Sequence, residues 1–464
     1  MPTPPHELTN QLVAAVTAKD AKRVKALLAQ GADPNAQSPE GLPLLCVAVA
    51  GFDDESAEAL TERGADADRE LADGTTPLVR AVDSGSPALV DALIGDDPRR
   101  RLPEVVQHRL LSLARHWMET GAEEELRRRT GASGAAVHRH VRDGRYSDVE
   151  EFCLGGLTCR AGHSAILTFL EKSFGIMTPV LELAARAVPY SIPEKTQVNW
   201  FAASSALAVR RSPQDRFALN ALRNHPDPVH RILLADVMWS RNFSVQVGRL
   251  NQSGDTGRDA EFLAAWALEE PDGLVLSWVL EAFAEHEHPD QEAIGLRYAD
   301  HPDPRVRRRI PDLFSRDVPP TDAVAVALLA LSRDPVPDVR WATASELAAH
   351  FTPAFREALL DLVNDSDCDV RAQAAIALGA SNDRTSAVTD ALVSVLDHGE
   401  QLVRLEIVYA LARRDDPRTD VAWERVGELP PGFGEVDGGG QVDHRILGYW
   451  DYQRRHRPSG SHAD

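Results

Sequence analysis

The strongest constraint on this fold is that the first hundred residues repeat with a period close to 33. The tripeptide Gly31-Ala32-Asp33 returns as Gly64-Ala65-Asp66, 33 positions later, and Gly41 returns as Gly74 after the same interval. Each unit reads as a Gly-Asp turn, a Pro-led apolar helix, a second apolar helix and another turn. One such helix pair cannot bury its apolar face alone, so about three units must stack to form a stable fold.

The third unit carries the most diagnostic motif. In DGTTPLVRAVDSGSPALVDALI, residues 73–94, Thr76-Pro77-Leu78 and Ala81 match a T-P-L-H-x-A signature, and Val79 stands where the signature has His. The first two units keep only parts of this motif. The segment resembles the ankyrin repeat, and we assign residues 1–97 to an ankyrin-like array.

A second repeat, marked by a Val-Arg pair, lies in the C-terminal half. Aligned on that pair, Arg307, Arg340, Arg371 and Arg404 follow one another after 33, 31 and 33 residues. In each unit a short apolar helix is followed by a turn of the D-P-x-x-V-R type and a helix whose apolar residues form one stripe. Degenerate copies precede the first of these arginines. The pattern resembles the short bacterial form of the HEAT repeat, and we assign residues 161–427 to a HEAT-like array.

Together the two arrays predict an all-α fold, a helical-repeat solenoid in which ankyrin-like N-terminal repeats precede a HEAT-like superhelix. Residues 98–160 are expected to form a helical connector with a hinge at GASGAAVHRHVRDG. No sheet is predicted beyond ankyrin-type turns. Residues 428–464 are expected to form a C-terminal cap followed by a flexible tail.

An Asp and an Arg recur at the start of the second helix of the HEAT-like units, for example Asp338 and Arg340. Asp338 is expected to cap its helix, because a carboxylate there satisfies free N–H groups and the positive end of the helix dipole. The HEAT resemblance implies that Arg340 reaches the corresponding Asp, or a carbonyl, of a neighbouring unit and so forms a ladder. Since the set recurs in each unit, a structural role is favoured over a single active site.

Composition and charge restrict the class of function. Acidic residues outnumber basic ones by 71 to 50, which gives a net charge of −21. Nucleic-acid binding needs a concentrated positive field, so a nucleic-acid partner is not expected. The sequence shows no secretory signal and no apolar run long enough to span a membrane, and four cysteines in a chain of this length are typical of reduced thiols. We therefore expect a cytoplasmic protein that does not act at a membrane.

No group of residues has the pattern of a catalytic or metal site. Cys153, Cys159 and His163 have a C-x5-C-x3-H spacing, which departs from the usual zinc spacing and lacks a fourth ligand. The stretch GHSAI lacks the final Gly of a nucleophile elbow. The one His-Glu pair in the second array, His286-Glu287, cannot build the di-iron site of the HEAT-like deoxyhypusine hydroxylases. We predict no catalytic residue, no metal and no cofactor.

The positions two and three residues after the Val of each second helix point away from the apolar stripe, toward the surface that is concave in HEAT arrays. Trp, Tyr and Arg, which dominate binding hot spots, are frequent there. With neighbours one turn later, the partner-binding candidates are Trp200, Arg231, Trp278, Arg308, Arg309, Asp312, Trp341, Leu405, Glu406 and Tyr409. The alternative is that these rings pack sideways between units.

The sequence therefore favours a non-catalytic scaffold or adaptor that binds a protein or peptide on the concave face of the HEAT-like solenoid, together with the ankyrin array. The alternative is a HEAT-like enzyme, or a base-excision-type nucleic-acid-binding protein, that uses the same cleft. That alternative needs a carboxylate beside aromatic rings, and Asp312 or Glu406 near Trp341 is the candidate pair.

Overall fold

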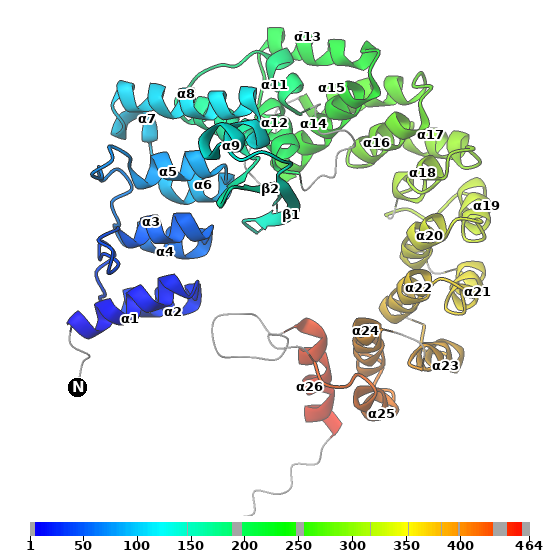
Figure 1. Cartoon of the computed structure of the whole chain (residues 1–464). Helices are drawn as coiled ribbons and strands as arrows, with labels where there is room; N and C mark the ends of the chain where they lie inside the picture. Colours follow the sequence, from blue (N-terminus) through cyan, green and yellow to red (C-terminus); the bar gives the residue numbers. More distant parts are fainter. Residues whose placement is uncertain are drawn as a thin grey trace, which may run out of the picture. The chain divides into compact units, whose positions relative to one another are not determined.

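The computed structural model divides into two compact units, Met1–Arg241 and Asn242–Asp464, each built of stacked helices (Figure 1). The predicted helical-repeat solenoid is confirmed. The residues that the structure describes are 5–145, 147–187, 197–246, 255–315, 317–350, 352–381, 383–397, 400–429 and 443–456.

The first unit begins with three helix pairs that correspond to the three ankyrin-like repeats. Their helices are α1 (Pro5–Thr17), α2 (Ala21–Ala29), α3 (Leu44–Gly51), α4 (Asp54–Glu62), α5 (Pro77–Ser84) and α6 (Pro87–Ile94). Leucines at their centres, such as Leu12, Leu44 and Leu89, are fully buried in one continuous core. Thr76 caps α5 by accepting a hydrogen bond from the Val79 N–H, as its place in the repeat motif requires.

The repeated Gly-Ala-Asp turn has a conformational and a bonding reason. Gly31 and Gly64 end their helices with φ angles of 92° and 88°, in the left-handed region that glycine adopts without strain. Asn35 then links the two turns: its amide donates to the Gly64 carbonyl at 3.1 Å and its side-chain oxygen accepts from the Asp66 N–H at 2.9 Å. The first turn is thus bonded to the second, which helps to fix the spacing between these two repeats.

The segment after the ankyrin-like pairs is helical only in its first half. Helices α7 (Pro98–Arg101), α8 (Glu104–Thr120) and α9 (Ala122–Thr130) are followed by three strands, β1 (Val137–Asp143), β2 (Ser147–Leu154) and β3 (Leu157–Arg160). They form an antiparallel sheet in the order β1-β2-β3. The expectation of a wholly helical connector without a sheet is therefore wrong. Strand β1 has only two apolar residues, Val137 and Val141, so it lacks the regular apolar alternation by which strands are recognised.

A buried polar cluster attaches this sheet to the last ankyrin-like pair. Asp143, at the end of β1, accepts hydrogen bonds from the Ser86 hydroxyl at 2.5 Å and from the Ala88 N–H at 3.0 Å, at the start of α6. The Arg160 guanidinium donates to the same carboxylate at 2.6 Å. The Gly162 N–H also donates to the Gly85 carbonyl at 3.1 Å. The sheet is therefore fixed to the repeat array by charged and backbone bonds.

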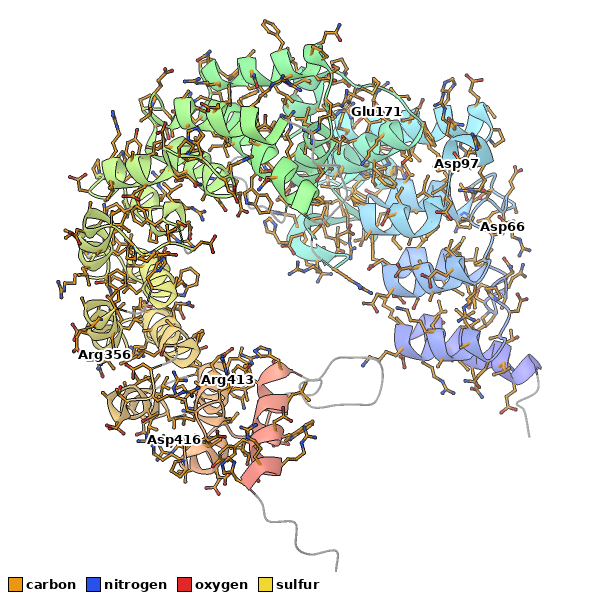
Figure 2. The ribbon with its side chains drawn as sticks, turned by 180° about the vertical axis from the view of Figure 1, so that it is seen from behind. Asp66, Asp97, Glu171, Arg356, Arg413 and Asp416 are labelled. Atoms are coloured by element: carbon orange, nitrogen blue, oxygen red, sulfur yellow. The ribbon has the colours of Figure 1, made fainter. Side chains whose placement is uncertain are left out.

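The rest of the first unit continues the helix stacking. It contains α10 (His163–Ser173), α11 (Val180–Ala187), α12 (Val198–Ala208), α13 (Pro213–Ala221), the short η1 (Leu222–Asn224) and α14 (Pro228–Gln246), which continues past the unit boundary. A buried ion pair joins α10 to α11: Arg186 donates to both oxygens of Glu171, which is labelled in Figure 2, at 2.7 and 3.0 Å. Thr178 donates to the same carboxylate, so this buried charge is paired and hydrogen-bonded.

The second unit is a continuous series of helix pairs. Its helices are α15 (Asp255–Ala267), α16 (Gly273–Ala284), α17 (Gln291–Tyr298), α18 (Pro304–Arg307), η2 (Pro311–Leu313), α19 (Asp322–Leu331), α20 (Pro337–Ala349), α21 (Pro353–Leu362), α22 (Cys368–Ala380), α23 (Ser386–Val395), α24 (Gln401–Ala412), α25 (Thr419–Glu424) and α26 (His444–His456). Within this unit α20, α22 and α24 follow one another along one side of the stack, and α19, α21 and α23 lie on the other (Figure 1).

Helix α26 packs on α24 at the end of this series. Tyr449 of α26 stacks on Trp423 of α25, with ring centroids 4.1 Å apart. The helix therefore occupies the place expected of a C-terminal cap. The expected flexible tail, at 457–464, lies outside the described residues.

The expected arginine ladder is present between neighbouring units. Arg340 makes a two-pronged ion pair with Asp365 of the next unit, at 2.7 and 2.6 Å, and donates to the Asp334 carbonyl at 2.7 Å. Arg307 pairs in the same way with the Asp334 side chain, at 2.6 and 2.9 Å. Asp338, however, makes no capping bond, because the N-cap of α20 is Val336 and Asp338 lies in the first turn.

Replacing Arg340 by Ala should lower the free energy of unfolding by about 1–3 kcal/mol, because Asp365 and the Asp334 carbonyl would lose a charged donor in a half-buried setting. The matched control is Arg333→Ala, which removes an exposed arginine from the turn just before the same helix. Urea unfolding followed by circular dichroism measures both variants. Equal stabilities for the two would show that the ladder does not support the stack.

Gly85→Ala should destabilise the first unit far more than Gly74→Ala. Both glycines have positive φ angles, 75° and 73°, so each substitution carries a backbone strain of about 1–2 kcal/mol. A Cβ at Gly74 would meet open space, whereas one at Gly85 would collide with the Arg160 carbonyl and displace the sheet. We expect an additional loss of about 1–3 kcal/mol for Gly85→Ala in the same unfolding measurement. Equal losses would mean that the sheet does not depend on this contact.

Candidate functional site

Of the residues expected to bind a partner, Trp341 and Arg308 lie together at the surface of the second unit. The Trp341 side chain, on α20, is 38% exposed. The Arg308 guanidinium lies 5.8 Å from the centroid of its ring, within the range of a cation–π contact. One turn further along α20, the Ser345 hydroxyl accepts a hydrogen bond from Gln373 of α22 at 2.6 Å. Ile376, one turn after Gln373, is 37% exposed.

We call these five residues, Arg308, Trp341, Ser345, Gln373 and Ile376, the Trp341 face. It combines an indole, a guanidinium, two hydrogen-bonding groups and an aliphatic side chain on three consecutive units of the array. Such a surface can cover an apolar side chain and pair with a carboxylate at the same time.

The candidates that precede Trp341 in the second unit are more strongly engaged. Arg309 pairs with Glu281 of α16 at 2.8 Å, and both side chains are largely covered. Burial lowers the pKa of the Arg309 guanidinium, and the nearby Glu281 carboxylate counteracts that shift. Trp278 is half-buried on α16, and Asp312 is exposed on η2.

Trp200 and Leu405 are corrections to the predicted set, because both are buried. Trp200 is 1% exposed, and its indole N–H donates to Asp236 at 2.8 Å. Helix α12 packs against both α10 and α11, which covers the face that the repeat pattern placed outside. Leu405 is fully buried because α24 lies between α22 and α26. These two residues follow the alternative of packing between units.

The last candidates are held by structural contacts. Glu406 pairs with Arg445 of α26 at 2.9 Å, and the Tyr409 ring meets His444 edge-on with centroids 5.2 Å apart. The Glu406 carboxylate is thus paired with α26. Glu406 itself lies on α24, two helix pairs after the helix that carries Trp341. Arg231, in α14, donates to the His225 carbonyl at 2.8 Å, six residues before it, as Arg340 does to Asp334.

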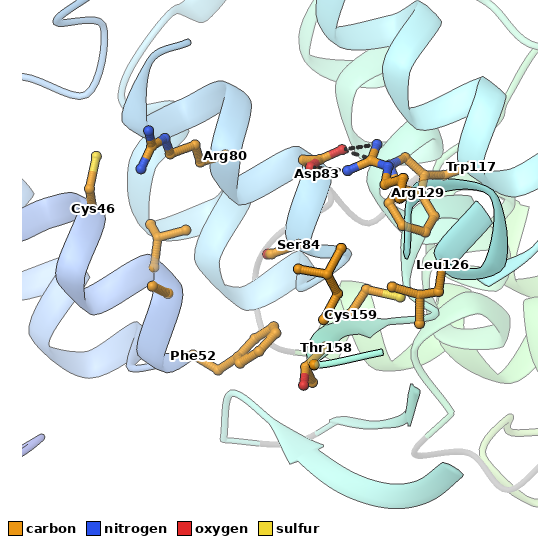
Figure 3. Close-up of a pocket in the computed structure, with 14 residues that line it drawn as sticks. Cys46, Phe52, Arg80, Asp83, Ser84, Trp117, Leu126, Arg129, Thr158 and Cys159 are labelled. Atoms are coloured by element: carbon orange, nitrogen blue, oxygen red, sulfur yellow. Dashed lines mark hydrogen bonds and ion pairs between the residues drawn. The ribbon is translucent and has the colours of Figure 1, made fainter. Parts of the chain in front are cut away.

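The first unit contains a separate cavity of about 460 Å³ that sequence reasoning did not find (Figure 3). Helices α3 and α5 of the ankyrin-like repeats form one side, and α8, α9 and the end of the sheet close it. Its lining includes Cys46, Phe52, Arg80, Asp83, Leu157 and Cys159. The sequence signal that could have located the cavity lies in α3 and α5. Several residues on these two helices line the cavity, and no role for them was expected from the sequence.

One wall of this cavity is an indole held by three polar groups. Asp83 accepts a hydrogen bond from the Trp117 indole N–H at 2.8 Å and two from Arg129, each at 2.7 Å. The Arg129 guanidinium lies 4.5 Å from the Trp117 ring centroid, and the buried His163 ring stacks on the same indole at 4.7 Å. Burial would raise the pKa of Asp83, but the hydrogen bonds from Arg129 and Trp117 lower it, so the carboxylate stays charged.

The cysteines and histidine near this cavity do not converge on one site. The register of the sheet pairs Cys153 with Thr158 and Phe152 with Cys159, which puts the two cysteines on opposite faces. Burial raises the pKa of Cys159 to about 12, so its thiol is protonated at neutral pH. A protonated thiol is a weak nucleophile and a poor metal ligand.

Among the described residues, no helix combines the length and the apolar character needed to cross a membrane.

His163 should make the protein less stable in mild acid. Burial lowers the pKa of His163 from 6.5 to about 4, so the folded state keeps the ring neutral while the unfolded chain takes up a proton below about pH 6.5. Stability is therefore complete above that pH and is lost as the pH falls through the window from 6.5 to 4. Between pH 7 and pH 5 the loss is about 2 kcal/mol.

Urea unfolding of the full chain at several pH values measures this effect. In His163→Gln the part of the pH dependence that comes from this ring should disappear, whereas His108→Gln, which changes an exposed histidine of α8, should keep it. Identical pH profiles for the two variants would contradict the assignment.

Comparison with known proteins supports the two types of repeat. A family model of ankyrin repeats in three copies matches residues 12–101, and a model of HEAT repeats matches residues 356–422. A search of curated proteins gives no match. Among solved structures, the chain is similar to the X-ray structure of YibA from Escherichia coli, with 17% identity over 59% of this chain and 92% of that one and a TM-score of 0.42. The chain therefore contains ankyrin repeats at residues 12–101 and, further along, HEAT repeats at residues 356–422.

Proposed function

We propose that the protein is a non-catalytic scaffold or adaptor, and that it binds a protein or peptide segment on the Trp341 face of its HEAT repeats. The observation that carries the proposal is the exposed Trp341 indole beside the Arg308 guanidinium. Ankyrin and HEAT repeats are a typical protein-interaction fold, which supports the general class.

The chemistry of the Trp341 face favours a segment with one large apolar and one acidic residue. An apolar side chain would cover the indole and Ile376, and a carboxylate would pair with Arg308. Ser345 and Gln373 already bond to each other, and both can also bond a peptide backbone. Because the whole chain carries a net charge of −21, affinity should come from close burial rather than from long-range attraction.

The net charge also bears on the kind of partner and its location. An acidic chain repels a phosphate backbone, which favours a protein partner over a nucleic acid. Four cysteines without a disulfide are typical of a reducing compartment, and the location we propose is the cytoplasm. The ankyrin repeats would supply a second contact through their inner helices.

Trp341→Ala should weaken binding by about 2 kcal/mol or more, which is about 30-fold in Kd, while leaving the fold nearly intact. The physical reason is that a partly exposed indole contributes less to the core than to a partner that covers it. Peptides selected from a random displayed library on the full chain serve as ligands, and fluorescence anisotropy of a labelled peptide gives Kd. Thermal unfolding by circular dichroism gives stability.

The matched control is Val326→Ala, which removes an exposed side chain from α19, on the other side of the same stack. It should leave both affinity and stability unchanged. If the selected peptides bind Trp341→Ala and wild type equally well, the Trp341 face is not the binding surface. A loss of about 3–5 kcal/mol in stability would instead show that Trp341 is a core residue.

A further inference from the structure

The β-hairpin in the first unit carries two histidines and a glutamate on one exposed face. Antiparallel pairing places His140 directly opposite Glu150 and His138 opposite Phe152. Residues two apart on a strand share a face, and directly paired residues share it too. His138, His140 and Glu150 therefore project to the same side of the sheet.

The side-chain positions agree with this placement. A Glu150 carboxylate oxygen lies 4.0 Å from Nδ1 of His138 and 3.9 Å from Nε2 of His140. Both rings are mostly exposed, at 61% and 79%, so ions in solution can reach them. Within the described residues of the first unit, neither of these ring nitrogens has a hydrogen-bond partner.

The arginines on either side of His140, Arg139 and Arg142, pair with other carboxylates and not with Glu150. The adjacent Glu151 points to the opposite face, where it accepts two hydrogen bonds from Arg139, at 2.9 and 2.7 Å. Arg142, next along the face of the histidines, lies 3.4 Å from the Asp148 carboxylate opposite it. Arg139 and Arg142 are thus engaged by other acids, and the Glu150 carboxylate lies between two imidazoles.

We propose that His138, His140 and Glu150 form a binding site for a divalent transition-metal ion, with Zn²⁺ as the ion that suits them best. Two imidazole nitrogens and one carboxylate oxygen are a preferred donor set for Zn²⁺, and such three-ligand sites keep a fourth position for water. This site lies outside the Trp341 face and does not depend on the proposed function.

Binding an ion requires the three side chains to move together. Zn–N and Zn–O bonds of about 2.1 Å in a tetrahedral site put neighbouring donor atoms about 3.4 Å apart. The separations of 4.0 and 3.9 Å from the Glu150 oxygen need to close by roughly 0.5 Å each. The two ring nitrogens, which lie more than 4.8 Å apart, need to approach by roughly 1.4 Å or more, which exposed side chains can do by rotation. The backbone need not move.

The scaffold beneath the site is firm. The Phe152 ring lies against the His138 ring, with centroids 5.7 Å apart, and limits its rotation. The end of β1 is anchored by the Asp143 bonds to Ser86 and Arg160. β1 is an edge strand that pairs with β2 on one side. An ion bound by residues of both strands would add a second link between them.

The test uses the full chain without a histidine tag, stripped of metal with a chelator and then titrated with Zn²⁺ alone by isothermal calorimetry. We expect one ion per chain at this site. His138→Ala, His140→Ala and Glu150→Gln should each weaken binding by about 100-fold or more, because loss of an outer-shell partner alone costs about 10- to 100-fold. Co²⁺ should give the visible absorption of a tetrahedral site in wild type and lose it in these variants.

Two controls separate this site from other binding on the chain. His108→Ala removes an exposed histidine of α8, and Cys368→Ser removes the thiol of Asp367, Cys368 and Asp369, another group of possible metal ligands. Both variants should bind Zn²⁺ like wild type. The proposal is overturned if wild type binds no ion, if binding survives His140→Ala or Glu150→Gln, or if Cys368→Ser abolishes it. Thermal unfolding of each variant checks that the exposed substitutions leave the fold intact.

Discussion

Burial of each helix pair against its neighbours is the constraint on which both units depend. No pair in either array is large enough to cover its own apolar stripe, so each unit is stable only as part of a stack. The same requirement sets the spacing of polar contacts. Asn35 links successive turns in the first array, and Arg307 and Arg340 link successive units in the second. The Arg307 and Arg340 pairs repeat because the apolar faces bring the same positions together in successive units.

The arrays leave different surfaces free for function. In the second unit the inner helices pack side by side, so most positions on them are covered by neighbours. Trp341 remains 38% exposed, and its neighbour in the preceding unit is Arg308, the C-cap of the four-residue helix α18, whose guanidinium lies over the indole. In the first unit the cavity lies between helices α3 and α5 of the ankyrin repeats on one side and α8, α9 and the end of the sheet on the other.

The inserted sheet connects structure to chemistry in the first unit. A buried Asp143 is acceptable because Ser86, Ala88 and Arg160 satisfy its oxygens, and that network orients the hairpin. The histidines of the hairpin can face solvent because β1 contributes little to the apolar core.

The sequence by itself determined the two repeat types and the helical arrays, because periodic apolar positions encode contacts between neighbours. The arginine ladder was implied by the resemblance to HEAT repeats. The sequence did not reveal the sheet, since β1 has only two apolar residues. The dipeptides at the turns of the sheet, Asp143-Gly144 and Gly155-Gly156, are of kinds common in hairpin turns, and they are the signal by which the sheet could have been found. Trp341 and Trp200 occupy the same position of the repeat, so the sequence could not show that the first is exposed and the second buried. Tertiary structure decided them, because burial depends on which helices flank that position, and the flanking helices come from other parts of the chain.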